Sequence, residues 1–386
     1  MEGDRAVVDW RESVSLKTDT FESVVVSLLS QTNLEGSFKL HPLSGGANNR
    51  IFRIEVGHKN VLLKIYFQHS DDVRDRLGAE FSFSRFAWEN GIRSLPKPLA
   101  CDHKNGLGLY DFVEGRSLTS NDVTENLIKQ ALHFYHELNQ HKTSNSARIL
   151  PKASEACFTT GEHLKCVERR LHHLQRINSE SVIDREALSF ITNELSQAWS
   201  RVLSFVQKQS SKLKLSLDQE VIGQDKCISP SDFGFHNALL SQNGNLYFID
   251  FEYAGWDDPA KMVCDFFSQP SIPVSFNYFD TFSESVVSKM TEPKLHLNRI
   301  RLLLPVYQIK WCCILLNDFV AVGDARRKFA SNTEDEEDRK KKQLEKARKM
   351  LGSVILSKAK DLQDRSFPHA LGGNPQTWIP DKNIRG

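Results

Sequence analysis

The chain has 386 residues, and its 50 lysines and arginines almost balance its 49 aspartates and glutamates. This length predicts about two to three domains, or two lobes with an insertion, and excludes a small disulfide-stapled scaffold. The net charge of +1 excludes the basic excess of a typical nucleic-acid-binding protein and the acidic excess of a solvating tail. The seven cysteines form no CxxC pair, so we expect reduced thiols, no disulfides and no zinc site.

The apolar segments of the chain do not resemble targeting or membrane segments. The first residues carry acidic side chains and no apolar core, so we expect no secretory signal. The longest apolar stretch, 300–322, is interrupted by Arg301, Pro305 and Lys310, which a membrane span tolerates poorly. We therefore expect a cytoplasmic monomer or homodimer with neither a membrane nor a nucleic-acid partner.

The first third of the chain alternates between helical and strand periods. Strand-like alternation on both sides of the turn at 57–60 predicts a β-hairpin, and Gly91 is a typical helix stop. The predicted elements are, in chain order, a helix over 20–29, strands over 51–56 and 61–67, a helix over 71–90, and strands over 99–103 and 107–113. These elements predict a small β-rich lobe over 37–115, preceded by a helical extension over 1–36.

The rest of the chain is mostly helical in its apolar spacing, which predicts a larger second lobe over 116–365. The predicted helices cover 121–141, 162–176 and 185–208, and a further helix begins at about Pro259. A β-rich island over 228–255 interrupts them. The charged run at 331–349 is interpreted as an exposed helix, or a loop running into one, rather than a partner-binding site. A Pro/Gly-rich, irregular tail is expected over 366–386.

The β-rich island carries the strongest chemical signal. Asn243-Gly244 is typical of a type I′ hairpin turn, and a two-residue loop there aligns Asn237 with Asp250 on neighbouring strands. An amide and a carboxylate placed side by side are oxygen ligands that suit Mg²⁺. Glu252 points to the same strand face as Asp250, so it is a further candidate, either for a second metal ion or for a water molecule.

Asp232 stands five residues before Asn237. Asp-x4-Asn followed across a hairpin by Asp-Phe is the arrangement by which protein kinases surround a transferring phosphoryl group. In that arrangement Asp232 orients the acceptor hydroxyl, while Asn237 and Asp250 hold the metal. The neighbouring His236 is interpreted as a packed loop residue rather than a base.

The first lobe supplies matching nucleotide-binding candidates. Ser44, Gly45 and Gly46 lie at a junction between strands, where small residues let backbone N–H groups approach phosphate oxygens. Lys64 lies in an apolar strand and needs an anionic partner, for which Glu80 in the following helix is the natural candidate. The last candidates are Asp111, Phe112 and Val113, in the segment that would link the lobes and face the adenine.

These residues resemble the aminoglycoside phosphotransferase and choline kinase superfamily. The resemblance runs from about Leu40 to Phe267 and is clearest in the motifs 43–46 and 248–255. It implies a bilobal, protein-kinase-like α+β fold, with a helical insertion in the larger lobe. It also implies Mg²⁺ and ATP or GTP as cofactor and co-substrate, and phosphoryl transfer to a hydroxyl of a small molecule. The chain departs from the family at Pro230-Ser231, where His-Gly or a close variant usually precedes the catalytic aspartate.

The resemblance leaves the acceptor open among amino alcohols, aminoglycosides and sugars. It places the acceptor pocket in the segments 145–223 and 267–351. Asp257 and Asp258 are candidates for binding a cationic acceptor, or equally for capping a helix N-terminus. The resemblance further suggests that Asp265 is a structural carboxylate that hydrogen-bonds the backbone of the catalytic loop.

Two other functions remain open. In a nucleotide-binding pseudokinase or interaction module, Pro230-Ser231 would mark lost catalysis and the charged segment at 334–349 would dock a partner. The retention of Lys64, Asp232 and Asp250 argues against it. A kinase acting on a protein is disfavoured because no long activation segment separates Asp250 from the helix that follows.

Overall fold

A computed structural model of the protein describes residues 18–43, 49–69, 72, 74–320, 329 and 335–354. The chain divides into two compact units, Met1–Val354 and Ile355–Gly386, and everything described below belongs to the first. Ser44, Gly45, Gly46, residues 331–334 of the charged segment and the predicted tail lie outside the described residues.

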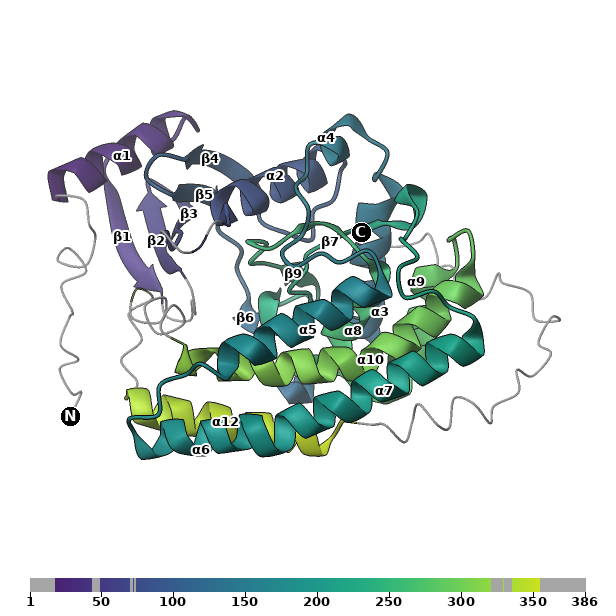
Figure 1. Ribbon diagram of the computed structural model, residues 1–386. Helices are drawn as coiled ribbons and strands as arrows, with labels where there is room; N and C mark the ends of the chain where they lie inside the picture. Colours follow the sequence, from purple (N-terminus) through teal and green to yellow (C-terminus); the bar gives the residue numbers. More distant parts are fainter. Residues whose placement is uncertain are drawn as a thin grey trace. The chain divides into compact units, whose positions relative to one another are not determined.

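The first lobe is built on a five-stranded antiparallel sheet (Figure 1). Its strands, in spatial order, are β1 (Phe38–Leu43), β2 (Arg50–Val56), β3 (Lys59–Ile65), β5 (Leu107–Asp111) and β4 (Pro98–Asp102). The predicted hairpin is confirmed as β2 and β3, with Val56 opposite Lys59 and Gly57 at a φ of 56°. Glycine adopts this left-handed conformation without steric cost.

Helix α2 (Arg76–Glu89) begins five residues later than the sequence predicts. The side chain of Asp75 accepts a hydrogen bond from the backbone N–H of Gly78 at 2.8 Å and so caps the first turn. Such a cap satisfies one of the free N–H groups that every helix start presents. The cap therefore fixes the register of the helix that carries Glu80.

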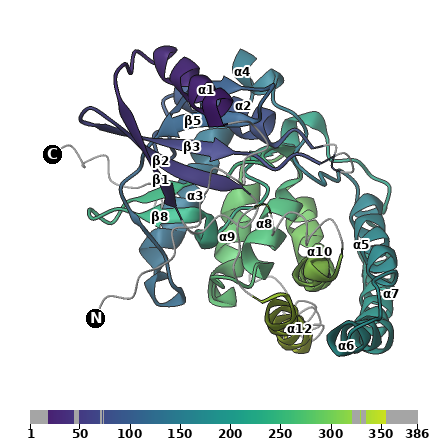
Figure 2. The same cartoon turned by 90° about the vertical axis from the view of Figure 1, so that its left-hand side faces the viewer.

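Helix α1 (Thr18–Ser30) packs in the core of the first lobe. Its residues Phe21, Val25 and Leu28 are buried in one cluster with Ile54 and Leu63 of the sheet. Burying an apolar side chain of this size stabilises a fold by about 1.5–3 kcal/mol. Figure 2 shows α1 lying along the sheet.

The second lobe is mostly helical, as predicted. Its helices are α3 (Glu125–Gln140), α4 (Asn145–Arg148), α5 (Thr160–Leu174), α6 (Val182–Phe190), α7 (Ser196–Leu213), α8 (Pro259–Ser268), α9 (Phe279–Val287), α10 (Pro293–Leu315) and α12 (Glu336–Gly352). The helix predicted over 185–208 is two helices, α6 and α7, joined by a π-helical turn at Ile191–Leu195. All seven cysteines are free thiols.

Helix α10 is the centre of this lobe and contacts α5, α7, α8, α9 and α12 (Figure 2). Pro293–Phe319 is long and apolar enough to cross a membrane by length and composition, but most of it is buried inside the fold. Neighbouring helices cover its apolar surface and so account for that composition. The segment is a core helix, as its interrupting polar residues predict.

The described part of the charged segment is helix α12, and it is more than a solvated face. Leu344 and Ala347 are buried against the lobe. Lys340 lies 3.1 Å from Asp184, which belongs to α6. The helix therefore packs one face against its neighbours while its other charges remain exposed, a pattern that net charge alone conceals.

The hairpin of the predicted β-rich island consists of β8 (Ala238–Leu240) and β9 (Leu246–Phe248), and its register differs by one residue from the prediction. Leu240 pairs with Leu246, and the loop spans the five residues 241–245. Only Gly244 of the two predicted turn residues has a positive φ, at 77°, whereas a type I′ turn requires a positive φ at both. The N–H of Gly244 donates to the carbonyl of Ser241 at 3.0 Å, which is the hydrogen bond of a type I turn.

Three more short strands complete the lobe. They are β6 (Arg116–Ser117), which pairs with β8, and β7 (Cys227–Ser229), which pairs with β10 (Gly255–Asp257). The chain thus leaves the first sheet at Asp111 and joins a strand of the second lobe at Arg116.

Candidate active site

The two lobes meet at Lys64. Its Nζ lies 2.6 Å from Oε2 of Glu80 and also donates a hydrogen bond to Oδ1 of Asp250, which follows β9. The predicted Lys64–Glu80 ion pair is therefore present, with both side chains 7% exposed. Burial disfavours a charged ammonium, but the charges of Asp250 and Glu80 outweigh burial and hold the pKa of Lys64 well above its usual value. Lys64 stays a cation that faces the site.

Two tyrosines fix Glu80, and the sequence reasoning missed both. The hydroxyl of Tyr66 donates to Oε2 of Glu80 at 2.7 Å, and the hydroxyl of Tyr110 lies 2.8 Å from that of Tyr66. Burial raises the pKa of both phenols well above the usual value, so both remain hydrogen-bond donors. A signal was available, because Tyr66 is two residues beyond Lys64 and residues at that spacing in a strand share a face.

Asp232 lies in the loop between β7 and β8. Its Oδ1 is 3.2 Å from Nε2 of His236, and its backbone carbonyl accepts a hydrogen bond of 3.0 Å from the side-chain amide of Asn237. Burial favours a neutral carboxyl, but the charge and hydrogen bond of His236 outweigh burial and lower the pKa of Asp232. Asp232 is therefore a carboxylate, and His236 is its direct partner as well as a packed loop residue.

Asp250 adopts a left-handed backbone conformation, with a φ of 66°. Burial, with the negative charges of Glu252 and Glu80, raises the pKa of Asp250 to about 7, although Lys64 opposes the shift. The shifted register of the hairpin aligns Asn237 with Ile249, whose N–H donates to the Asn237 carbonyl at 2.9 Å. The predicted direct alignment of Asn237 with Asp250 is therefore wrong by one residue.

The donor set at Asp250 and Asn237 fits Mg²⁺. A divalent cation stabilises a carboxylate whose pKa is raised by acidic neighbours, and Mg²⁺ is usually bound by one or two carboxylates together with water and phosphate oxygens. The amide nitrogen of Asn237 is used within the loop, which leaves its oxygen for a ligand role. Within the described ranges, the chain forms no cluster of three or more His, Cys, Asp or Glu side chains suited to a metal. Nucleotide oxygens would complete this site.

Glu252, two residues after Asp250, contacts the first lobe, which the sequence reasoning did not foresee. Its Oε2 accepts a hydrogen bond of 2.7 Å from Asn49 and lies 3.6 Å from Nε of Arg76. Asn49 also accepts a hydrogen bond from the backbone N–H of Phe67. All three charged or polar side chains are buried. Asn49 therefore joins the start of β2 to Glu252 of the second lobe.

The interpretation of Asp257 and Asp258 as acceptor-binding carboxylates is wrong, because both are completely buried and paired. Asp258 caps α8 by accepting a hydrogen bond from the N–H of Ala260 at 2.8 Å, and it pairs with Arg299 at 2.6 Å. Asp257 pairs with Lys261 at 2.7 Å. The helix-cap alternative is therefore correct for Asp258, and neither carboxylate is exposed to a ligand.

Asp265 has different partners from those expected. Its oxygens accept hydrogen bonds from Nε1 of Trp311 at 2.9 Å and from Nζ of Lys310 at 3.3 Å, both on α10. It holds α8 to α10 rather than bonding the catalytic-loop backbone directly. A different residue of α8, Lys261, contacts the loop that carries Asp232, because its Nζ donates a hydrogen bond to Oγ of Ser231.

The remaining nucleotide candidates lie where the lobes join. The N–H of Asp111 donates to the carbonyl of Lys97 at 2.9 Å, so this N–H is already used within the protein. Phe112 and Val113 follow β5 and are partly exposed. Their proximity to an adenine stays a prediction.

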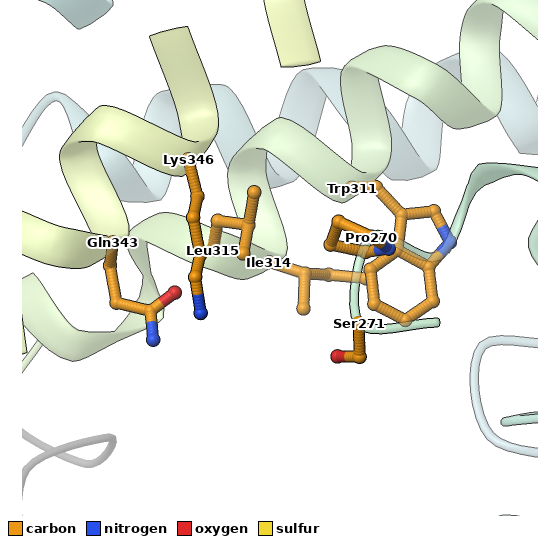
Figure 3. Close-up of a pocket in the computed structure, with 7 residues that line it drawn as sticks. All are labelled: Pro270, Ser271, Trp311, Ile314, Leu315, Gln343 and Lys346. Carbon is orange, nitrogen blue, oxygen red and sulfur yellow. The ribbon is translucent and has the colours of Figure 1, made fainter. Parts of the chain in front are cut away.

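A pocket of about 160 Å³ opens beside α10 (Figure 3). The described residues that line it are Pro270, Ser271, Trp311, Ile314, Leu315, Gln343 and Lys346. The ring of Trp311 also lies 6.5 Å, between ring centroids, from that of His236, the partner of Asp232. Trp311 thus connects the wall of this pocket to the catalytic loop. None of the lining side chains is a carboxylate.

Comparison with known proteins identifies the family. A sequence model of choline/ethanolamine kinases matches residues 40–293. The chain belongs to the choline/ethanolamine kinase family. It is 21% identical over 287 residues to a probable ethanolamine kinase B of Dictyostelium discoideum, and the alignment covers 63% of each chain, less than two thirds of that relative.

Solved structures confirm the bilobal, kinase-like fold that choline/ethanolamine kinases share. An ethanolamine kinase of Plasmodium vivax superposes with a TM-score of 0.56 at 13% identity and covers 91% of this chain and 93% of its own. A choline/ethanolamine kinase family protein of Mesorhizobium loti gives 0.54 at 13%, covering 89% and 97%. A spectinomycin phosphotransferase in complex with ADP and spectinomycin gives 0.52 at 14%, covering 85% and 98%.

Proposed function

We propose that the protein is a small-molecule kinase that transfers the γ-phosphoryl group of ATP to a hydroxyl group. The observation that carries this proposal is the position of Lys64, which bonds Glu80 of its own lobe and Asp250 of the other. In kinases, a lysine in this position binds nucleotide phosphates, a glutamate positions the lysine, and an aspartate holds the metal ion. Membership of the choline/ethanolamine kinase family supports the same chemistry.

Each residue then has a defined role. Lys64 binds the α- and β-phosphates, and Glu80 holds Lys64 in place. Asp232 orients the acceptor hydroxyl and receives its proton as the oxygen attacks the γ-phosphorus. Asn237 and Asp250 would hold Mg²⁺, which when bound neutralises developing charge on the phosphate oxygens. Because such transition states are loose, positioning and charge neutralisation supply most of the acceleration.

Two observations favour different acceptors. The family, and the relatives named ethanolamine kinases, favour an amino alcohol. The pocket beside Trp311 lies within the predicted acceptor segment 267–351 and offers Gln343 and Lys346 rather than a carboxylate, which favours a neutral hydroxyl compound such as a sugar. We propose ATP rather than GTP as the co-substrate, because the structure of the spectinomycin phosphotransferase contains ADP.

The test is nucleotide consumption by the wild type and by Asp232→Asn, with ethanolamine, choline, aminoglycosides and neutral sugars as acceptors. Acceptor-stimulated ADP formation that Asp232→Asn abolishes, with nucleotide binding retained, is the expected result. Asp102→Asn makes the same chemical change at a carboxylate that bonds Asn105 in the turn after β4, and it should leave turnover intact.

The alternatives predict other results. A pseudokinase binds nucleotide and shows no turnover with any acceptor. A protein kinase transfers labelled phosphate to polypeptides in an extract rather than to small molecules. Turnover undiminished in Asp232→Asn would remove Asp232 from the proposed role.

A further inference from the structure

Ser231, the residue before Asp232, has an unusual backbone conformation. Its φ is 67°, in the left-handed region where residues other than Gly, Asn and Asp are uncommon. Glycine would adopt this conformation freely, but serine does not. The side chain is buried. A serine here needs compensating contacts to keep the loop in this shape.

Lys261 supplies such a contact. From α8, its Nζ donates a hydrogen bond of 2.8 Å to Oγ of Ser231 and one of 2.7 Å to Oδ2 of Asp257, and it lies 3.6 Å from Oδ2 of Asp265. Lys261 is 1% exposed. Burial disfavours its charge, but Asp257 and Asp265 outweigh burial and raise its pKa above the usual value. A charged, desolvated ammonium makes strong hydrogen bonds.

The contact between Lys261 and Ser231 is not needed for the ion pairs of α8. Lys261 pairs with Asp257 four residues earlier, and Asp265 is held independently by Trp311 and Lys310. The hydrogen bond to Ser231 instead crosses to a loop 30 residues away in the sequence. The loop has further support, because the N–H of Ser231 donates to Oγ of Ser229 at 2.9 Å and Oγ of Ser231 donates to the backbone carbonyl of Ser154 at 3.4 Å.

We propose that Lys261 is a positioning residue for phosphoryl transfer: its hydrogen bond to Ser231 holds the left-handed backbone that directs the Asp232 carboxylate toward the acceptor hydroxyl. This inference rests on the proposed kinase function. It assigns the support of the loop that carries Asp232 to a lysine of α8.

The decisive comparison is Ser231→Ala against Ser231→Gly. Both variants remove Oγ and with it the hydrogen bonds to Lys261 and to the Ser154 carbonyl, but alanine still opposes the left-handed backbone and glycine does not. We expect Ser231→Ala to lower kcat about tenfold, because small displacements of a reacting group are costly, while the Kd for nucleotide stays within about twofold of the wild-type value. Ser231→Gly should recover most of the lost kcat.

Lys261→Met provides the second arm. In the wild-type background it should lower kcat as Ser231→Ala does, again with little change in nucleotide affinity. In the Ser231→Ala background it should have little further effect on kcat, because the hydrogen bond is already absent. Lys142→Met is the matched control, since Lys142 donates to the backbone carbonyls of Gln224 and Lys226, and it should leave kcat unchanged.

Three results overturn the inference while leaving the kinase function intact. The first is a kcat for Ser231→Ala equal to that of the wild type, and the second is an equal loss of kcat in Ser231→Ala and Ser231→Gly. The third is a double variant in which the effects of Ser231→Ala and Lys261→Met on kcat multiply fully. If Lys261→Met does not fold because Asp257 loses its partner, the comparison of the two Ser231 variants decides alone. Absence of turnover by the wild type with every acceptor would instead overturn the proposed function, and this inference with it.

Discussion

Lys64 on β3 and Asp250 after β9 form an ion pair that joins the two lobes of the protein. Glu80 shares the same ammonium group from α2, and burial with acidic neighbours raises the pKa of Asp250 to about 7. The site therefore holds more carboxylate than cation before any ligand binds. Nucleotide phosphates would compete with Asp250 for the ammonium group of Lys64. A divalent cation would then replace Lys64 as the positive charge beside Asp250.

Substitution of Lys64 tests this arrangement. Lys64→Met removes the cation between two buried or partly buried carboxylates, so kcat/KM should fall at least about a hundredfold. The melting temperature should also fall, since breaking a buried ion pair from one side costs about 3–5 kcal/mol. Lys59→Met, at the exposed start of the same strand, should change neither quantity. A Lys64→Met protein with normal turnover would exclude Lys64 from phosphate binding.

The two tyrosines behind Glu80 should show a graded effect. Tyr66→Phe removes the donor to Glu80, so we expect a loss of about fivefold in kcat/KM, equivalent to about 1 kcal/mol. Tyr110→Phe acts one hydrogen bond further away and should cost less. Steady-state kinetics at varied ATP concentration measures both. The opposite order would mean that Tyr66 does not act through Glu80.

Binding of Mg²⁺ and nucleotide should release protons at neutral pH. With a pKa of about 7, the Asp250 carboxyl is about half protonated at pH 7 in the free protein, and a metal ligand must be deprotonated. Calorimetric titrations with Mg–ADP in buffers of different ionisation enthalpy should show release of about half a proton at pH 7 and almost none at pH 9. Asp250→Asn should remove both this release and most of the Mg²⁺ dependence. Equal proton release in the wild type and Asp250→Asn would contradict the assignment.

His136 should make stability depend on pH. Burial, with the nearby charge of Lys289, lowers its pKa from the usual 6.5 to about 4, and its Nε2 lies 2.9 Å from Oγ of Ser285. Between pH 6.5 and 4 the unfolded chain binds a proton there that the folded protein does not. The free energy of unfolding should therefore fall as pH drops through this window, with no contribution above pH 6.5.

Urea unfolding of His136→Gln at pH 7.0 and pH 5.0 measures this contribution. The variant should lose less stability than the wild type between the two pH values. His58→Gln, in the exposed turn of the first hairpin, should behave as the wild type does. An unchanged pH dependence in His136→Gln would show that His136 titrates alike in the folded and unfolded states.

Patterns within the sequence determined the local elements and the order of the chemistry along the chain. Alternating apolar residues on either side of Gly57 predicted the hairpin that carries Lys64, because strand faces repeat every two residues. The apolar strand around Lys64 predicted an acidic partner, and the structure has Glu80 there. These inferences depend on short-range geometry, which sequence spacing encodes directly.

The tertiary structure alone decided which charges face the site and which are used inside the fold. In the sequence, Asp257 and Asp258 could bind a cationic acceptor, but in the structure both are buried. Asp257 pairs with Lys261 and Asp258 with Arg299. The hairpin register changed by one residue because only Gly244 took a positive φ. The contact of Lys261 with Ser231 joins residues 30 positions apart, and no spacing rule encodes it. Such pairings depend on which elements pack together, and packing is settled by the whole fold.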